Sequence, residues 1–380
     1  MGVPRPLYEA IIVKPRDVVP SHEDMEVIGV CNPGGSVFYD NKIKKEKIYL
    51  LLRVMEKTKT EFLGHVAAPR AISKDGKYIV RWEWERIGKD AHIEDKTIII
   101  TEPEERKRPT DISHFRLAES TDGIEFKISE KPSFFPEKRY EEFGVEDARI
   151  TKFEELINVG RQSYRYLMSY VACSEKYDVC TAFAVTNDFK KFVRLPKENP
   201  RIIFFAPSKD VVVFPKKIIN LRTGKKEFSA LTRPMGCARY MAPSIFLSYS
   251  RDLIQWGDHE LLVEGNEKGH VGAGPTPIEC EEGWLIIDHQ HRHLLNGEKE
   301  YIGRAYLLDK GNPLEILKKS EEILEPHLKV EDEPIVKNVT FPSAAIVKDN
   351  KIFVYTGEED VAIGVHVYDF NDFMGFLNPA

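Results

Sequence analysis

The chain is 380 residues long, with 42% hydrophobic residues, 31% charged residues and a formal net charge of -6. This balance is typical of a globular protein. The acidic excess argues against nucleic acid as a partner, because no surplus of Lys and Arg is available to neutralise phosphates. No apolar run is long enough to cross a bilayer, so we predict no membrane partner.

Cysteine usage and the N-terminus predict a cytoplasmic location. The five cysteines are scattered, and no CxxC or His-bracketed spacing appears, so we expect neither a disulfide framework nor a cysteine zinc site. Unpaired cysteines are typical of a reducing compartment. The first residues also lack the apolar region of a secretory signal.

A turn pattern of the form Asp-x-x-x-aromatic recurs about every 60 residues, a spacing in the range of structural repeats. Its copies begin at Asp122, Asp188, Asp252 and Asp372, with a degenerate copy at Asn312. Asp and Asn open tight turns by accepting hydrogen bonds from the backbone that follows them. The pattern therefore divides the chain into five units.

Each unit contains short runs of β-branched and aromatic residues that are typical of strands. The strongest runs are 48–53, 166–170, 227–231, 284–287 and 352–355. Five units of about four strands each predict an all-β fold, a five-bladed β-propeller. An irregular β-sandwich with coincidental turns is the alternative.

We predict a single domain over residues 1–380, because no Gly/Ser-rich or Pro-rich linker divides the chain. Two segments lie outside the repeat. Residues 1–30 form an N-terminal extension, in which the strand candidate 8–13 either closes the ring or caps it. Residues 83–112 form a rim insertion, whose aromatic side chains offer a contact for a homo-oligomer.

A charged cluster, Glu146, Asp147 and Arg149, stands immediately before a run that reads as a buried strand. Charges are costly to bury unless they are paired or line a wet cleft. Strand alternation predicts that Glu146 and Arg149 lie on one side and Asp147 on the other. A surface group of salt bridges is the structural alternative.

Polar residues occur at equivalent places near the strong strands of all five units. They are Asn32 and Arg53, Asp147 and Arg149, Lys209, Asp210 and Arg233, His289, and Asp360. Propellers carry their functional groups on the loops and inner strands around the central channel. The repetition therefore predicts a polar pocket of the size of a sugar at one channel mouth.

Three histidines, His289, His291 and His293, alternate in sequence and would share one face of a strand. Such a set could hold zinc, which makes a metal-dependent hydrolase the first rival function. We predict no metal here, because the adjacent turn at 294–297 works against three extended ligands. The second rival is a non-enzymatic propeller that binds carbohydrate or protein.

Several motifs together resemble glycoside hydrolase family 130, the mannoside phosphorylases and related mannosidases. They run in order from Asn32 to Asp360. They are Asn32-Pro33, Leu51-Leu52-Arg53, Glu146-Asp147-Ala148-Arg149 where the family usually has Glu-Asp-Pro-Arg, 209–215, Arg233-Pro234, 272–279, 338–342 and 355–360. The family is built as a five-bladed propeller, in agreement with the repeat count.

The resemblance implies inverting cleavage of β-mannosidic bonds in small manno-oligosaccharides, by phosphorolysis or hydrolysis. Asp147 would be the general acid, with a pKa raised toward neutrality by the cleft and by Glu146. The sugar-binding positions implied are Asn32, Arg53 and Asp360, to which we add Glu146, Arg149, Arg233 and His289 from the charged cluster and the strand ends. Lys209 matches a residue that contacts phosphate, and inorganic phosphate is the only co-substrate implied, with no cofactor.

Two departures from the family bear on the nucleophile. Cys180 stands where the phosphorylases have an arginine, and Thr232-Arg233-Pro234 replaces a frequent His-Arg-Pro. Guanidinium groups bind phosphate best, so the loss of one weakens phosphorolysis unless Arg233, Lys209 or Arg239 compensates. If water attacks instead, a second carboxylate must act as base. Glu227 and Glu279 are the first candidates.

Overall fold

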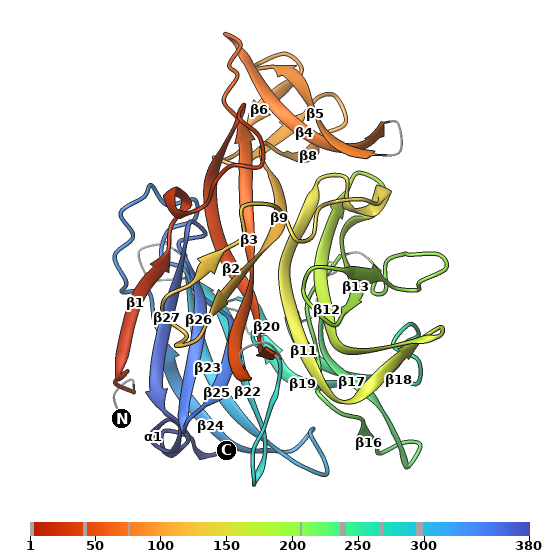
Figure 1. Cartoon of the computed structure of the whole chain (residues 1–380), viewed down its shortest axis with the longest axis vertical. Coiled ribbons are helices and arrows are strands. Elements are labelled where there is room, and N and C mark those ends of the chain that lie inside the picture. Colours follow the sequence, from red (N-terminus) through yellow and green to blue (C-terminus); the bar gives the residue numbers. More distant parts are fainter. Residues whose placement is uncertain are drawn as a thin grey trace.

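A computed structural model describes residues 4–40, 44–74, 77–205, 207–235, 241–265, 269–293 and 299–380. Five antiparallel sheets are arranged around one axis (Figure 1). The predicted all-β, five-bladed β-propeller is confirmed. The strong runs found in the sequence all lie in the second strands of these blades, β3, β12, β17, β22 and β26.

The first three blades follow the chain in order. Blade one contains β2 (Met25–Asp40), β3 (Lys45–Thr58), β9 (Ile112–Ser120) and β10 (Lys127–Ile128). Blade two contains β11 (Gly144–Val159), β12 (Gln162–Ser174), β13 (Asp178–Thr186) and β14 (Phe192–Arg194). Blade three contains β15 (Ser208–Val213), β16 (Ile218–Asn220), β17 (Lys225–Pro234), β18 (Ala242–Ser250) and β19 (Trp256–Gly265).

The last two blades include strands from both ends of the chain. Blade four contains β20 (Val271–Ala273), β21 (Ile278–Glu279), β22 (Gly283–His293), β23 (Lys299–Asp309), β24 (Ile316–Leu324) and β28 (Asn378–Pro379). Blade five contains β25 (Thr340–Lys348), β26 (Lys351–Glu358), β27 (Ala362–Asp369) and β1 (Tyr8–Val13). The helices are the short 3-10 turns η1 (Pro15–Asp17) and η2 (Arg139–Glu141), and α1 (Phe370–Gly375).

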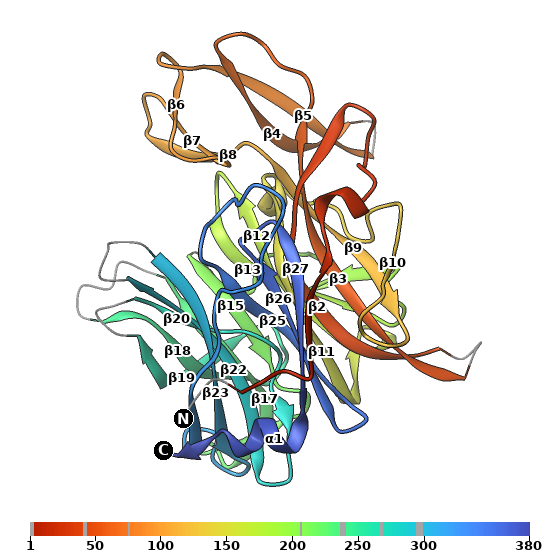
Figure 2. The ribbon, with the colours of Figure 1, turned by 90° about the vertical axis from the view of Figure 1, so that its left-hand side faces the viewer.

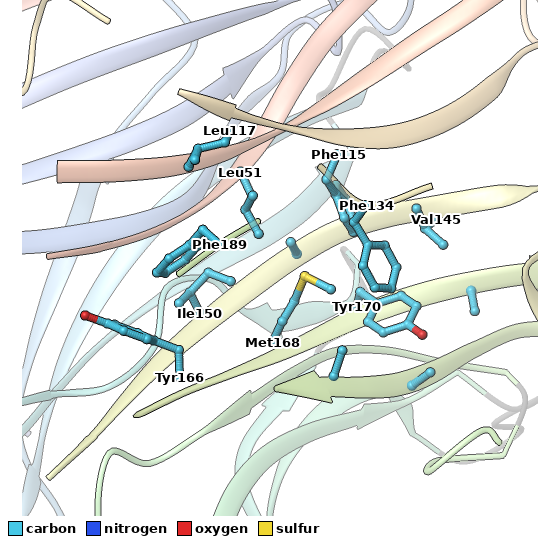
Figure 3. Packing of buried hydrophobic residues seen from close by; sticks show 14 of the residues in the cluster. Leu51, Phe115, Leu117, Phe134, Val145, Ile150, Tyr166, Met168, Tyr170 and Phe189 are labelled. Atoms are coloured by element: carbon cyan, nitrogen blue, oxygen red, sulfur yellow. The ribbon is translucent and has the colours of Figure 1, made fainter. Parts of the chain in front are cut away.

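Every blade is buried on both faces. In β22, Trp284 and Ile286 pack in the cluster shared with blade three, whereas Leu285 and Ile287 pack in the cluster shared with blade five. Successive side chains of a strand point to opposite faces, so a strand between two neighbours must be apolar throughout. Figure 3 shows the equivalent cluster between blades one and two, in which Leu51 and Leu117 face Met168.

The N-terminal strand closes the ring. Strand β1 pairs antiparallel with β27 as the outer strand of blade five, and in Figure 1 it lies along the side of the propeller beside that strand. The sequence had left open whether this segment closes or caps the ring. The last residues of the predicted extension, 1–30, belong to blade one, because β2 begins at Met25.

The rim insertion forms two small sheets of its own. Strands β4 (His65–Lys74) and β5 (Lys77–Arg86) make a hairpin, and β6 (Ala91–Ile93), β7 (Ile98–Thr101) and β8 (Arg106–Pro109) make a second sheet. Both project from one end of the propeller (Figure 2). The separate structure therefore starts at β4, whereas the sequence pattern placed the insertion at residues 83–112.

The recurring turns are real, but two were assigned to the wrong residue. Asp122, Asp188 and Asp252 each accept hydrogen bonds from the backbone N–H groups two and three residues later. In blades four and five the same bonds go to Asp309 and Asp369, three residues before Asn312 and Asp372. Asp372 instead lies inside α1, which Asp369 caps.

None of the helices in the described part of the chain is long and apolar enough to cross a membrane.

Candidate active site

One end of the axis holds a polar cavity of about 160 Å³. Seven predicted site residues line it: Asn32, Arg53, Asp147, Lys209, Arg233, His289 and Asp360. Asp210, which was named beside Lys209 without a role in the site, also lines the cavity. The residues that sequence reasoning missed are His270, Tyr301, Val336, Val339 and Phe341. Two larger hollows, of about 730 and 930 Å³, contain none of these side chains. The polar groups of five units thus meet at one place.

The inner strands deliver their side chains through a shared backbone device. Asn32, Asp147 and Asp210 all have positive φ, at 42°, 51° and 53°. Each lies where the ladder to the next strand of its blade is interrupted by a bulge. Asn and Asp tolerate this left-handed conformation better than most residues. A bulge redirects a side chain, and here it turns three of them into the cavity.

The bulge in β11 overturns the expected alternation of Glu146 and Asp147. Arg53 contacts both carboxylates, with Nη2 2.9 Å from Glu146 Oε1 and Nη1 3.1 Å from Asp147 Oδ1. The prediction that the two carboxylates face opposite sides was wrong, because a regular pleat was assumed. Glu146 does not line the cavity. It instead holds Arg53 and Lys209, whose Nζ lies 3.4 Å from Oε2.

Asp147 presents one free oxygen. Oδ1 accepts hydrogen bonds from Asn32 Nδ2 at 3.0 Å and from Arg53 at 3.1 Å, whereas none of the described residues donates to Oδ2. The Asn32 contact requires Gly357, because a Cβ there would stand 1.9 Å from Asn32 Oδ1. Oδ2 is therefore the atom available to a bound substrate.

The pKa of Asp147 is shifted opposite to the expectation. Burial alone would raise it, but Arg53, Lys209, Arg149 and the Asn32 hydrogen bond outweigh burial and hold the pKa below its ordinary value. The cations were underestimated from sequence, since only Glu146 was considered as a neighbour. In the unliganded protein Asp147 is ionised at neutral pH.

Asp360, at the turn between β26 and β27, behaves in the opposite way. Burial, followed by the charges of Asp147 and Glu146, raises its pKa to about 6 despite the nearby Arg53. No described residue donates a hydrogen bond to its carboxyl group. Asp360 is thus a second group available to bind sugar hydroxyls, and it exchanges a proton near physiological pH.

The far side of the cavity carries unpaired donors. Arg233 contacts Asp210 at 2.5 Å through Nη2, but its Nε and Nη1 are buried with no hydrogen-bond partner among the described residues. His270 and Tyr301 lie beside this guanidinium, with ring centroids 5.7 Å apart. Burial and Arg233 lower the pKa of His270 to about 3, so its imidazole is neutral. Unpaired buried donors are costly, and an anionic ligand would satisfy them.

Arg149 was predicted to bind substrate, but it supports the site from behind. Its side chain is buried, and Nε donates to the carbonyl of Gly274 in blade four at 2.7 Å. Nη1 donates to the carbonyls of Asp147 and Ala148. Arg149 does not line the cavity. It fixes the bulge that carries Asp147.

The three alternating histidines lie on β22 as expected, but they do not converge as ligands. His289 is buried beside Asp210, with Nε2 3.3 Å from Oδ2, and His291 stacks on His270. Among the described residues, the one set of potential metal ligands whose atoms lie within 4.8 Å of one another is Glu9, His327 and His366. The turn at 294–297 lies outside the described residues.

The first candidates for a catalytic base are misplaced. Glu227 binds Asn220 and Arg251, and Glu279 binds Lys216 and Lys310, and neither lines the cavity. Arg239, considered as a phosphate ligand, lies outside the described residues. The motif Asn32-Pro33 lies within β2, and the next residue, Gly34, is packed so closely that a Cβ there would stand 2.7 Å from the Ala148 carbonyl oxygen.

Comparison with known proteins identifies the family. The profile of glycoside hydrolase family 130, described as beta-1,4-mannooligosaccharide phosphorylase, matches residues 105–379. The chain is 33% identical over 359 residues to the beta-1,2-mannobiose phosphorylase of Listeria innocua, covering 93% of this chain and 92% of that one. The structure of that enzyme with beta-1,2-mannobiose has a TM-score of 0.79, covering 96% of each chain. A 1,2-beta-oligomannan phosphorylase of Thermoanaerobacter is 32% identical, over 69% of this chain and 80% of its own. The resemblance seen in the motifs and the enzyme class that it implied are confirmed, and the chain belongs to glycoside hydrolase family 130.

Proposed function

We propose that this protein cleaves short β-mannosides by phosphorolysis with inversion, that its preferred substrate is β-1,2-mannobiose, and that Asp147 supplies the proton. The arrangement of the cavity carries this proposal. A carboxylate with one free oxygen stands on one side, and a guanidinium with two free donors stands on the other.

The cation side supplies the phosphate site in this proposal. Arg233 keeps free donors at Nε and Nη1, on different edges of the guanidinium, and a phosphate oxygen at either edge would accept a charge-assisted hydrogen bond. Lys209 lines the same cavity, and its pKa is raised by Glu146 and Asp147 against the effect of burial, so it remains charged. With Arg233 in this role, the arginine that Cys180 replaces is not essential.

The lowered pKa of Asp147 fits a proton donor that becomes protonated only when its substrate phosphate binds. Arg53, Lys209 and Arg149 hold the proton off in the free protein. A phosphate dianion beside Lys209 and Arg233 offsets part of this positive potential, so the pKa of Asp147 rises when phosphate binds. The proton then passes from Oδ2 toward the glycosidic oxygen as the phosphate attacks the anomeric carbon from the opposite face.

The linkage preference follows from the relatives. Two relatives that are 33% and 32% identical, over 92% and 80% of their own lengths, act, by name, on β-1,2-linked mannosides. The family description names β-1,4 linkages instead. A cavity of about 160 Å³ favours a short substrate over a long chain.

A cytoplasmic location remains a prediction from cysteine usage.

The test is a product assay on β-1,2-mannobiose with and without inorganic phosphate, with β-1,4-mannobiose as the matched substrate. We expect α-mannose 1-phosphate and mannose in equal amounts, strict dependence on phosphate, and faster turnover of the β-1,2 disaccharide. Release of two mannose molecules without phosphate would make water the nucleophile. Faster turnover of the β-1,4 disaccharide would reverse the linkage assignment.

A further inference from the structure

A second group of chemically active side chains lies away from the axial cavity, where the ring closes. Glu9 belongs to β1, His366 belongs to β27, and His327 lies in the segment that follows β24. Glu9 and His366 are directly opposite one another in the antiparallel ladder. Directly opposed residues hold their Cβ atoms about 4.5–5.5 Å apart, so the backbone fixes this pair.

The potential ligand atoms of these residues converge on one point. Glu9 Oε2 lies 2.9 Å from His327 Nε2 and 3.3 Å from His366 Nδ1, and all three atoms lie within 4.8 Å of one another. Zinc binds imidazole nitrogen and carboxylate oxygen at about 2.0–2.2 Å, which places the ligand atoms of a tetrahedral site about 3.3–3.5 Å apart. The two separations from Glu9 are close to that edge length, and the two histidine nitrogens lie within 4.8 Å of each other.

The outer nitrogen of each histidine faces an acceptor of the kind that metal ligands use, and that of His327 is hydrogen-bonded to it. His327 Nδ1 donates to the carbonyl of Glu325 at 2.8 Å, which leaves the lone pair of Nε2 directed at Glu9. His366 Nε2 faces Glu358 Oε1 at 3.6 Å, and Glu358 is held by the hydroxyls of Thr340 and Thr356. Metal-binding histidines commonly place their second nitrogen against a carbonyl or a carboxylate in this way.

Burial suits a site with one open position. The His366 side chain is 1% exposed, whereas Glu9 and His327 are 32% and 48% exposed. Two imidazoles and one carboxylate therefore occupy the protein side, and water can complete the coordination from outside. Imidazole with carboxylate favours zinc and related transition metals over magnesium or calcium.

We propose that Glu9, His327 and His366 form a binding site for a divalent transition-metal ion, zinc by preference. The ion would link β1 and β27 of blade five to the segment after β24. The ion bridges three segments that are far apart in the sequence. Its role is to stabilise the closed ring, because a ligand that binds only the folded protein shifts the folding equilibrium toward it. The site does not depend on the phosphorolysis proposed for the axial cavity.

The experiment uses the purified full-length chain after treatment with a chelator. Zinc is titrated by calorimetry, cobalt(II) is titrated by visible absorption, and Tm is recorded with and without zinc. We expect one zinc ion per chain, the absorption of a tetrahedral cobalt centre, and a Tm that rises by a few degrees. Magnesium should give none of these signals.

Three variants decide which residues are responsible. His327→Ala removes an exposed ligand, so the fold should survive, and zinc affinity should fall at least 10-fold with loss of the Tm shift. His22→Ala is the matched control, because His22 contacts Asp24 at 2.7 Å on the surface without a third ligand, and it should bind zinc like the parent. His293→Ala tests binding at the strand histidines.

Three results would overturn the proposal. The first is that the parent chain binds no zinc. The second is that His327→Ala binds zinc with full affinity. The third is that His293→Ala, and not His327→Ala, abolishes zinc binding. Each result assigns the contacts of Glu9 to ordinary ion pairs with histidine.

Discussion

The two ladders that β12 forms in blade two, one with β11 and one with β13, differ in regularity. Near the start of β11 the ladder to β12 breaks between Glu146 and Arg149, and Asp147 takes a positive φ of 51°. In the adjoining ladder of the same blade, β12 pairs with β13 from Tyr166 to Ser174 without interruption. The first region is polar and irregular, and the second is apolar and regular.

This difference separates the strands that stabilise the fold from the strand that carries the site residues. Regular ladders between β12 and β13 carry side chains into the clusters that join blade two to its neighbours. Residues in sparsely populated backbone conformations persist only where their surroundings fix them. The middle strands thus stabilise positions such as Asp147, which the inner strands alone would not hold.

The sharpest test of the comparison is Asp147→Asn, which keeps the shape of the side chain and removes its ability to act as an acid. We expect turnover of β-1,2-mannobiose with phosphate to fall about 10³-fold, roughly 4 kcal/mol, because general acids contribute 10²- to 10⁴-fold. The measurement is kcat, with Tm recorded on the same sample.

Asp178→Asn is the matched control for Asp147→Asn. Asp178 also has a positive φ, 54°, but it is exposed at the first position of β13. Its variant should keep both kcat and Tm. A rate for Asp147→Asn within 10-fold of the parent would remove Asp147 from proton transfer.

The opposite region is tested by Met168→Ala in β12, whose side chain is fully buried in the cluster of Figure 3. We expect a loss of about 3 kcal/mol in the free energy of unfolding, since such truncations leave a cavity. Because Met168 does not line the axial cavity, kcat and KM measured well below Tm should stay unchanged. A large change in KM would show that the two regions are coupled.

The pKa of Asp360 predicts a change of stability with pH. Because its folded pKa of about 6 lies above the ordinary value of 3.8, the folded state retains the proton longer than the unfolded state. Stability is therefore highest below pH 4 for this group, and it falls as pH rises through 6. We expect Asp360→Asn to gain about 2–3 kcal/mol of unfolding free energy, relative to the parent, between pH 4 and pH 7. Equal pH profiles in denaturant titrations would contradict this.

The smallest effect concerns a residue that only makes room. Gly357→Ala places a methyl group 1.9 Å from Asn32 Oδ1, so Asn32 must move away from Asp147. We expect kcat/KM to fall roughly 10- to 100-fold, because misplacement of a positioning group lowers the rate strongly. Gly257→Ala is the control, since nothing lies within 4 Å of a Cβ there. An unchanged rate for Gly357→Ala would make the Asn32 contact dispensable.

The sequence was informative wherever the signal repeats. Turn-forming Asp residues and five apolar runs predicted the propeller, because each blade must solve the same packing problem. Asp309 was missed, since no aromatic residue follows at the expected interval. Asp369 was missed although Phe373 follows it at that interval, because Asp372 and Phe376 fit the same pattern three residues later.

The site was predicted by residue type but not by direction. Simple alternation failed at Glu146 and Asp147, because a bulge changes which side chain faces inward. Asp210 was noted beside Lys209 but not assigned to the site, and the hint was that Asn32, Asp147 and Asp210 are all residues that tolerate positive φ. His270 immediately precedes β20 and Tyr301 lies in β23, and nothing in a single sequence marks them as neighbours.

The pairing of β1 with β27 also affects how the chain matures during synthesis. Residues Tyr8–Val13 leave the ribosome before any blade exists, yet their partner strand ends at Asp369. Throughout translation this strand stays without its mate, blade four waits for β28, and blades one to three can form while the circle is still open. A nascent chain of this kind is exposed to wrong pairings until its last blade emerges, so prolonged pausing late in translation should be more harmful than pausing early.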